Sequence, residues 1–179
     1  FEDVFLQKLI PYRIYGNTSF FKRKEIKDLT AYLRLILESD DEVTFERVIT
    51  SPKRGIGKTT IDKLVTFKQD NNYTMIEAIE QSDQILGNSA HTKLIHFKNQ
   101  IHSFRKHLNE LPFDDFIDLI LHESGYLASL DKDDKKEIRI ENLMEFKNML
   151  YENEQIYFEY SREEMLMFLL EEVTLKSEE

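Results

Sequence analysis

Apolar side chains recur three and four residues apart along most of this chain, which is the spacing of helices that bury one face. The stretch from Arg23 to Leu37 is typical, because Ile26, Leu29 and Leu33 fall on one helical face. Only five glycines and three prolines interrupt the pattern. The sequence therefore predicts a mostly α, multi-helix domain, with further helices over residues 45–49, from 58, over 75–80, from 89 to about 110, from 113, from the 131–136 loop to 150, and over 162–171.

Local signals mark several helix ends. Thr74 is a suitable cap for the short helix that follows it, and Ser161 with Glu164 three residues later has the sequence of a capping box. Ser124-Gly125 is typical of a helix C-terminus. These signals predict that helices begin just after Thr74 and Ser161 and that one ends at Ser124-Gly125.

Two short segments near the termini suggest strands instead. Tyr12–Tyr15 is rich in aromatic and β-branched residues and is followed by a Gly16-Asn17 turn. A lone strand cannot satisfy its own backbone, so it needs a partner. We expect that partner to be Glu172–Leu175 or a strand outside this sequence.

The composition is that of a folded protein, with 41% hydrophobic and 32% charged residues. There are no cysteines, which excludes disulfides, thiolate nucleophiles and cysteine-ligated zinc, and fits a reducing compartment. No apolar run approaches the roughly 18–20 residues that span a bilayer, and no basic-then-apolar leader opens the chain. We therefore expect a soluble, cytoplasmic protein with no membrane contact.

Charge is distributed unevenly along the chain, although the net value is −10. Residues 1–68 hold thirteen basic and ten acidic side chains, whereas residues 69–179 hold eleven and twenty-four. Phosphate is repelled by an acidic surface, so a polyanionic partner should contact the first third of the chain. A solvated surface of mixed charge without any partner is the alternative on charge alone.

The most informative motif runs from Ser51 to Ile61, with the sequence SPKRGIGKTTI. Gly57-Lys58-Thr59 matches the end of a Walker A loop, but Pro52 stands where that motif needs glycine. A short amphipathic helix, rather than a buried strand, is predicted ahead of it. Nucleotide binding at this loop is therefore not expected.

A helix-hairpin-helix over about residues 43–68 explains the motif better. In this arrangement two glycines adopt positive φ, Ile56 packs between the helices, and the amides that open the second helix face an anion. Such contacts hold a nucleic-acid backbone without reading its sequence, which predicts duplex DNA as the ligand. A tight interhelical turn with incidental lysines is the structural alternative. The candidate DNA-binding residues are Lys53, Arg54, Gly55, Ile56, Gly57, Lys58, Thr59 and Thr60.

The sequence does not support a zinc, calcium or catalytic site. No two of the histidines at 91, 96, 102 and 107 stand four residues apart, which argues against a zinc site. The acidic loop at 131–136 has Lys136 where a calcium loop needs glycine. No nucleophile, base or metal set stands out, so no catalytic, cofactor or metal residue is predicted in this chain.

Six segments, taken together and in order, carry a family resemblance. They are Ile10–Gly16, Phe20–Asp28, Ala31–Leu35, Pro52–Gly57, Ser124–Tyr126 and Arg139–Phe146. Their combination resembles the UvrD/PcrA/Rep family of superfamily 1 DNA helicases over nearly the whole chain. One difference is Asn17, where relatives commonly have a second glycine, and asparagine permits the same turn.

The resemblance implies a domain plan. Residues 1–37 are similar to the part of motor lobe 2A that leads into an insertion, residues 38–171 to the helical 2B insertion, and residues 172–179 to the return. It implies hinges near Leu37–Asp41 and near Glu171. The domain is then expected to swivel against the motor lobes and regulate unwinding.

The resemblance also implies a function for the parent protein, an ATP-dependent 3′-to-5′ DNA helicase of repair and replication that uses ATP and Mg²⁺. The ATPase motifs of that family match nothing in these residues, so this region alone is expected to be noncatalytic and to grip the duplex through the Gly55-Ile56-Gly57 hairpin. A module of another class is the alternative: the acidic helices after residue 69 would dock a protein partner, or autoinhibit the motor, without DNA.

Overall fold

The computed structural model describes residues 18–178, and every regular element in that range is a helix. None of these helices is both long enough and apolar enough to cross a membrane. In chain order the elements are η1 (Thr18–Lys22), α3 (Lys24–Ile36), α4 (Glu42–Ile49), α5 (Lys58–Asn71), α6 (Met75–Glu80), η2 (Ser82–Gln84), α7 (Asn88–His107), α8 (Phe113–Glu123), α9 (Tyr126–Ser129), α10 (Lys136–Ile156) and α11 (Arg162–Glu178).

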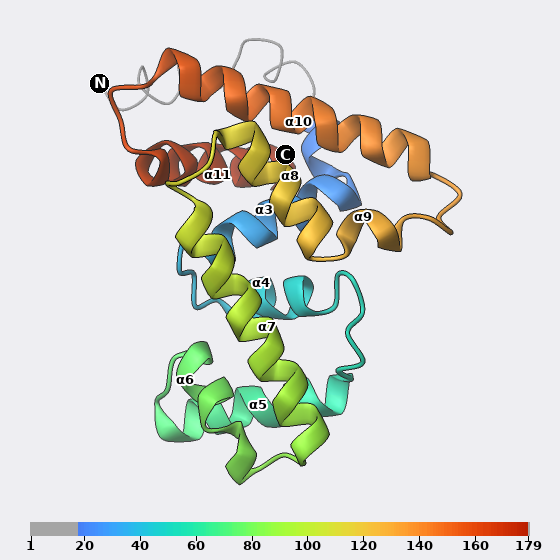
Figure 1. Cartoon of the computed structure of the whole chain (residues 1–179), viewed down its shortest axis with the longest axis vertical. Helices are drawn as coiled ribbons and strands as arrows, with labels where there is room; N and C mark the ends of the chain where they lie inside the picture. Colours follow the sequence, from blue (N-terminus) through green and yellow to red (C-terminus); the bar gives the residue numbers. More distant parts are fainter. Residues whose placement is uncertain (1–17, 179) are drawn as a thin grey trace.

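Helix α7 joins the two ends of the molecule (Figure 1). Its first half packs with α6 and η2 at one end, where α6 in turn packs on α5, and its second half leads to α8, α10 and α11 at the other. Helix α3 lies between these groups and contacts α4, α7, α10 and α11. The site discussed below therefore lies on a framework that α3 and α7 hold together.

The helix signals in the sequence are confirmed. Thr74 accepts a hydrogen bond from the Glu77 amide while the Glu77 carboxylate accepts from the Thr74 amide, which is a complete capping box. Ser161 and Glu164 exchange the same pair of bonds at the start of α11. Gly125 follows α8 with φ +81°, as expected of a glycine at a helix C-terminus.

The strand predicted at Glu172–Leu175 is wrong, because α11 runs without a break from Arg162 to Glu178. Leu169, Leu170 and Val173 are buried on one face at a helical spacing, and this burial outweighs the strand preference of valine and threonine. The strand predicted at Tyr12–Tyr15 lies outside the described residues.

The two expected hinge positions differ in the structure. Helix α3 ends at Ile36, and Glu38 just after it adopts a left-handed conformation with φ +68°, so a turn is present near the first position. No turn interrupts the chain at Glu171, which lies inside α11. The second expected hinge is therefore not a break in secondary structure.

A buried carboxylate on α3 connects three parts of the fold. Asp28 is 1% exposed and accepts hydrogen bonds from Lys24 Nζ at 2.7 Å, Arg47 Nε at 2.8 Å and the Tyr126 hydroxyl at 2.5 Å. Burial, and next the charge of Asp28, raise the pKa of Tyr126, so its hydroxyl keeps the proton that it donates. Asp28 thereby ties α4 and α9 to α3.

A second buried carboxylate of α3, that of Glu25, connects α10 to α3. Glu25 lies one helical turn before Asp28 and accepts from Arg139 Nη1 at 2.8 Å and from Asn142 Nδ2 at 2.7 Å. The two carboxylates together have five hydrogen-bonding partners, which are Lys24, Arg47, Tyr126, Arg139 and Asn142. Helix α3 consequently has a polar face that is buried rather than solvated.

We predict that Asp28→Ala lowers the free energy of unfolding by about 3–5 kcal/mol, because it leaves Arg47 and Tyr126 without their buried partner. Urea unfolding followed by circular dichroism measures this. Asp134→Ala, at an exposed loop position, is the control and should change stability by less than about 0.5 kcal/mol. Equal stability of the two variants would contradict the role of the carboxylate.

Candidate functional site

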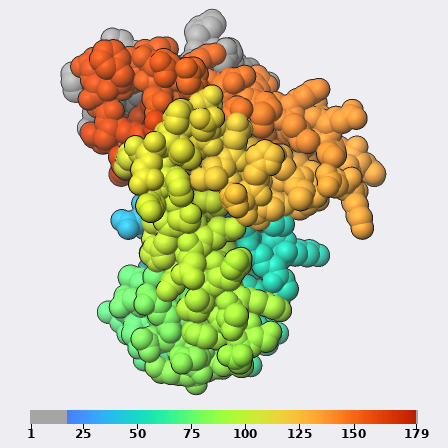
Figure 2. All heavy atoms as spheres, in the orientation of Figure 1, coloured from blue at the N-terminus to red at the C-terminus, as the bar shows by residue number. Residues whose placement is uncertain are grey.

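The helix-hairpin-helix predicted from the sequence corresponds to α4, the loop of residues 50–57 and α5. Helix α5 returns along α4, since Lys58 Nζ lies 2.9 Å from Glu46 Oε1 and Gln69 Nε2 donates to Glu42 at 3.1 Å. The loop runs down the right side of Figure 1. In Figure 2 the teal atoms of this part of the chain reach the surface beside the green atoms of α7.

The two loop glycines have different conformations. Gly55 adopts φ +73°, where a side chain would be strained, but Gly57 has φ −87° and is extended. The expectation that both glycines need positive φ is therefore wrong for Gly57. Ile56 between them is 9% exposed and belongs to the hydrophobic core, as predicted. The loop thus exposes glycine backbone on either side of a buried anchor.

The N-terminus of α5, like that of α7, has neither a side-chain cap nor an acidic residue in its first turn. Its N-cap, Gly57, has no side chain to accept from the first-turn amides, and the first turn contains no acidic residue. Asp41 and Thr74 supply that acceptor for α4 and α6. The amides at the start of α5, which include those of Thr59 and Thr60, therefore remain available to an external acceptor.

Two lysines flank this helix start. Lys53 is exposed, and it forms no ion pair within residues 18–178, which the structure describes. Lys58 is 69% exposed but lies 2.9 Å from Glu46 and 3.4 Å from Asp62. The Glu46 hydrogen bond, followed by that to Asp62, raises the pKa of Lys58. A phosphate contact by Lys58 would require it to leave these carboxylates, whereas Lys53 has no such ion pair within residues 18–178.

The guanidinium of Arg54 is turned inward, not toward solvent as a phosphate contact would require. Nη1 donates to Val48 O at 2.6 Å and to Pro52 O at 3.0 Å, and Nη2 donates to the Tyr32 hydroxyl at 2.7 Å. The same guanidinium lies 4.9 Å from the centre of the Phe97 ring. Arg54 therefore joins the loop to α3, α4 and α7.

Tyr32 completes this attachment. Its hydroxyl accepts from Arg54 and donates to Ser51 O at 2.6 Å, so a single buried phenol holds both sides of the loop. Burial raises the pKa of Tyr32, and the hydroxyl keeps the proton that it gives to Ser51. The Tyr32 side chain is 1% exposed, which leaves no water to compete for these bonds.

Lys93 on α7 is a cationic neighbour that sequence reasoning missed. Its Nζ donates to the Gly55 carbonyl at 3.2 Å, although 38 residues separate the two in sequence. An added Cβ on Gly55 would meet this Nζ at 3.0 Å. Nothing in the local pattern around Lys93 could indicate this contact, because it depends on how α7 packs beside the loop.

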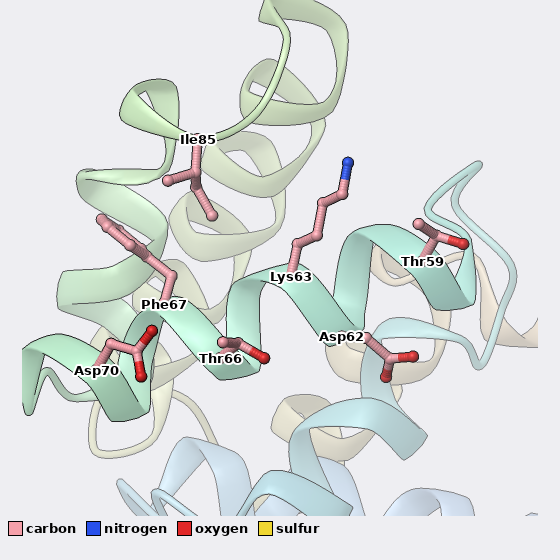
Figure 3. Close-up of a pocket in the computed structure, with 7 residues that line it drawn as sticks. All are labelled: Thr59, Asp62, Lys63, Thr66, Phe67, Asp70 and Ile85. Carbon is pink, nitrogen blue, oxygen red and sulfur yellow. The ribbon is translucent and has the colours of Figure 1, made fainter.

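A shallow cavity of about 450 Å³ lies along α5 and reaches Thr59 at the start of that helix (Figure 3). Phe67 and Ile85 lie near each other toward one end of α5, together with Asp70, and Lys63 and Asp62 lie further along the helix toward Thr59. Its two carboxylates make it unsuited to phosphate. No group of three potential metal-ligating side chains occurs among the described residues.

Comparisons with known proteins identify the relatives. The family described as UvrD-like helicase C-terminal domain matches residues 1–179. The chain is 38% identical to the ATP-dependent DNA helicase PcrA of Staphylococcus epidermidis over 148 residues, which are 81% of this chain and 20% of that protein. It is 40% identical to DNA helicase II of Haemophilus influenzae, over 80% of this chain and 20% of that protein. The chain thus spans about a fifth of the length of these relatives.

We predict that Gly55→Ala lowers the free energy of unfolding by about 1–2 kcal/mol, because alanine is strained at φ +73°. Gly57→Ala is the matched control: its φ is −87° and an added Cβ has nothing within 4 Å, so stability should be unchanged or slightly higher. Thermal unfolding of both variants measures the difference. Equal loss in the two would contradict the described loop conformation.

Proposed function

This chain belongs to the UvrD-like helicase C-terminal domain family, and we propose that it is a noncatalytic region through which a DNA helicase holds duplex DNA. The relatives are named ATP-dependent DNA helicase and DNA helicase II. In this proposal the ATP and Mg²⁺ sites belong to the motor lobes of the intact protein. This region supplies a grip on the duplex ahead of the fork.

The uncapped start of α5 is the observation that carries the proposal. Its free first-turn amides, the positive end of its helix dipole and the exposed lysines converge beside an exposed glycine. A phosphate diester can approach such a surface because Gly55 and Gly57 have no side chains in the way. Lys53 and Lys93 add the positive charge that a polyanion requires.

These contacts predict binding without sequence preference. Backbone amides and lysines contact phosphate oxygens, which are the same at every base pair, and none of them reads a base edge. The acidic remainder of the chain opposes nucleic acid, so binding should be strongly weakened by salt. Any duplex of sufficient length should serve as ligand.

Arg54 receives a different role from the one expected from the sequence. Three of its N–H groups are used inside the protein, on Val48, Pro52 and Tyr32. We therefore propose that Arg54 does not contact DNA. Instead it holds the loop in the conformation that exposes the amides at the start of α5. Direct phosphate contact by Arg54 would require these bonds to break.

The regulatory part of the proposal concerns movement against the motor lobes. The turn after α3 includes Glu38 with φ +68°, and it is the candidate hinge that the fold retains. Arg105 on α7 donates to the Leu35 and Ile36 carbonyls at the end of α3, at 3.0 and 3.2 Å, which links this turn to the long helix. A swivel confined to this turn would have to break the bonds from α3 to α4 and the hairpin loop, Arg47–Asp28 and Tyr32–Ser51, so the hairpin moves against the motor lobes only together with α3.

We predict that Lys53→Glu combined with Lys58→Glu weakens binding of a 20-base-pair duplex by at least about tenfold at low salt. The slope of log affinity against log salt should become shallower by about 2, since two phosphate contacts are lost. Fluorescence anisotropy of labelled duplex measures both quantities.

The matched control is the double variant Lys106→Glu and Lys132→Glu, which makes the same change of charge at exposed positions away from the loop. It should keep nearly the wild-type slope. Equal weakening by both double variants would show that net charge, not the hairpin, governs binding and would refute the site.

A further inference from the structure

A groove of about 520 Å³ adjoins the hairpin on the side of α7. It lies between the loop that contains Lys53, the polar face of α7 and the end of α8. The side chains and backbone that line it include Lys53, Lys93, His96, Gln100, His122 and Glu123. No catalytic or binding role discussed above uses its two histidines.

One wall of the groove is a single face of α7. Lys93, His96 and Gln100 are spaced three and four residues apart, so they follow one another along the helix. Lys93 is fixed at one end by its bond to Gly55 O at 3.2 Å, and Gln100 at the other by its bond to Glu123 O at 2.7 Å. Seven residues of helix rise by about 10 Å, which sets the length of this wall.

The opposite wall is the turn between α8 and α9. Gly125 adopts φ +81° there, and Pro52 of the hairpin loop lies 3.6 Å from the position that a Cβ on Gly125 would take. The two loops are therefore in close contact at the base of the groove. His122 and Glu123 stand at the end of α8 and are exposed, as is His96 across from them.

The groove is electropositive and becomes more so when its histidines take up protons. Two lysines and two histidines line it, against one carboxylate, Glu123. Arg54 also lines it, but its guanidinium is bonded inward. A neutral imidazole offers one N–H donor, whereas the protonated ring offers two and a positive charge.

We propose that this groove is a second phosphate-binding track, continuous with the start of α5, in which His96 and His122 contact the DNA backbone when protonated. The inference rests on the proposed function and extends it to named residues and to a pH dependence. A wall of about 10 Å is long enough to face about two neighbouring phosphates of one strand. The hairpin then holds one phosphate and the groove its neighbours.

The pH dependence has a definite sign. Phosphate binds the protonated imidazole preferentially, so duplex affinity rises as pH falls through the range in which histidine titrates. The other charged groups that face the groove are Lys53 and Arg54 from the loop, Lys93 from α7 and Glu123 from α8. Side chains of these types ordinarily keep their charge between pH 6 and 8, so the histidines account for the change.

The test compares the 179-residue chain with the double variant His96→Gln and His122→Gln, using anisotropy with a 20-base-pair duplex of arbitrary sequence. We expect the wild type to bind about three- to tenfold more tightly at pH 6 than at pH 8. The double variant should lose this gain, and its salt slope at pH 6 should be shallower by about 1–2, while its affinity at pH 8 stays near that of the wild type.

His102→Gln is the matched control, because this histidine is also exposed on α7 but lines a different cavity. His102 lies outside the groove, and its partial burial, followed by the charge of Arg105, lowers its pKa, so the control should keep the wild-type pH dependence. Both histidines of the groove are exposed, and the helical circular dichroism of the double variant should match that of the wild type.

The outcomes separate the two proposals. If the wild type binds duplex but the double variant keeps its pH dependence and salt slope, the track is refuted while the hairpin site stands on the Lys53 and Lys58 variants. If His102→Gln removes the dependence equally, the groove is again refuted. If the wild type binds no duplex at low salt at either pH, the proposed function and the track both fail.

Discussion

The geometry of the candidate site depends on one buried interaction, the hydrogen bond that the Arg54 guanidinium donates to the Tyr32 hydroxyl beneath the loop. This pair binds the loop to α3, and the Val48 carbonyl binds the same guanidinium to α4. Because Tyr32 also donates to Ser51, both sides of the turn are anchored at one point. A glycine-containing loop would otherwise be free to change conformation, and preorganised amides hold an anion at lower entropic cost than mobile ones.

The anchor is itself part of a polar face that α3 directs into the protein. Glu25, Asp28 and Tyr32 follow one another along this helix and reach α10, α4, α9 and the hairpin loop in turn. Burying charge is costly unless each group is paired, and each of these side chains has at least two partners. The hairpin is thus coupled through α3 to the end of the molecule where α10 lies, which suits a grip that has to move as one body with its domain.

Much of this fold follows from the sequence, and the exceptions have physical causes. Helix periodicity and the caps at Thr74 and Ser161 are local properties, and the Gly-Ile-Gly spacing identifies the loop. The segment from Glu172 favoured a strand locally, but burial of Val173 against the core made it helical. The positive charge of Arg54 suggested a phosphate contact. In the structure its guanidinium is turned into the protein, where it bonds to backbone carbonyls and lies over the Phe97 ring. The contact between Lys93 and Gly55 could not be predicted from the sequence, because it depends on packing between elements that are distant along the chain.

The most direct test of the account is a two-dimensional NMR titration of the ¹⁵N-labelled chain with a short duplex, read at the backbone amides. The account predicts that the largest shifts occur at Gly55 and at Lys58–Thr60, where the amides that open α5 would meet phosphate. The first turn of α8, which contains Asp114 and Asp115, should shift little. Shifts confined to other surfaces, with the α5 amides unchanged at saturating duplex, would contradict it.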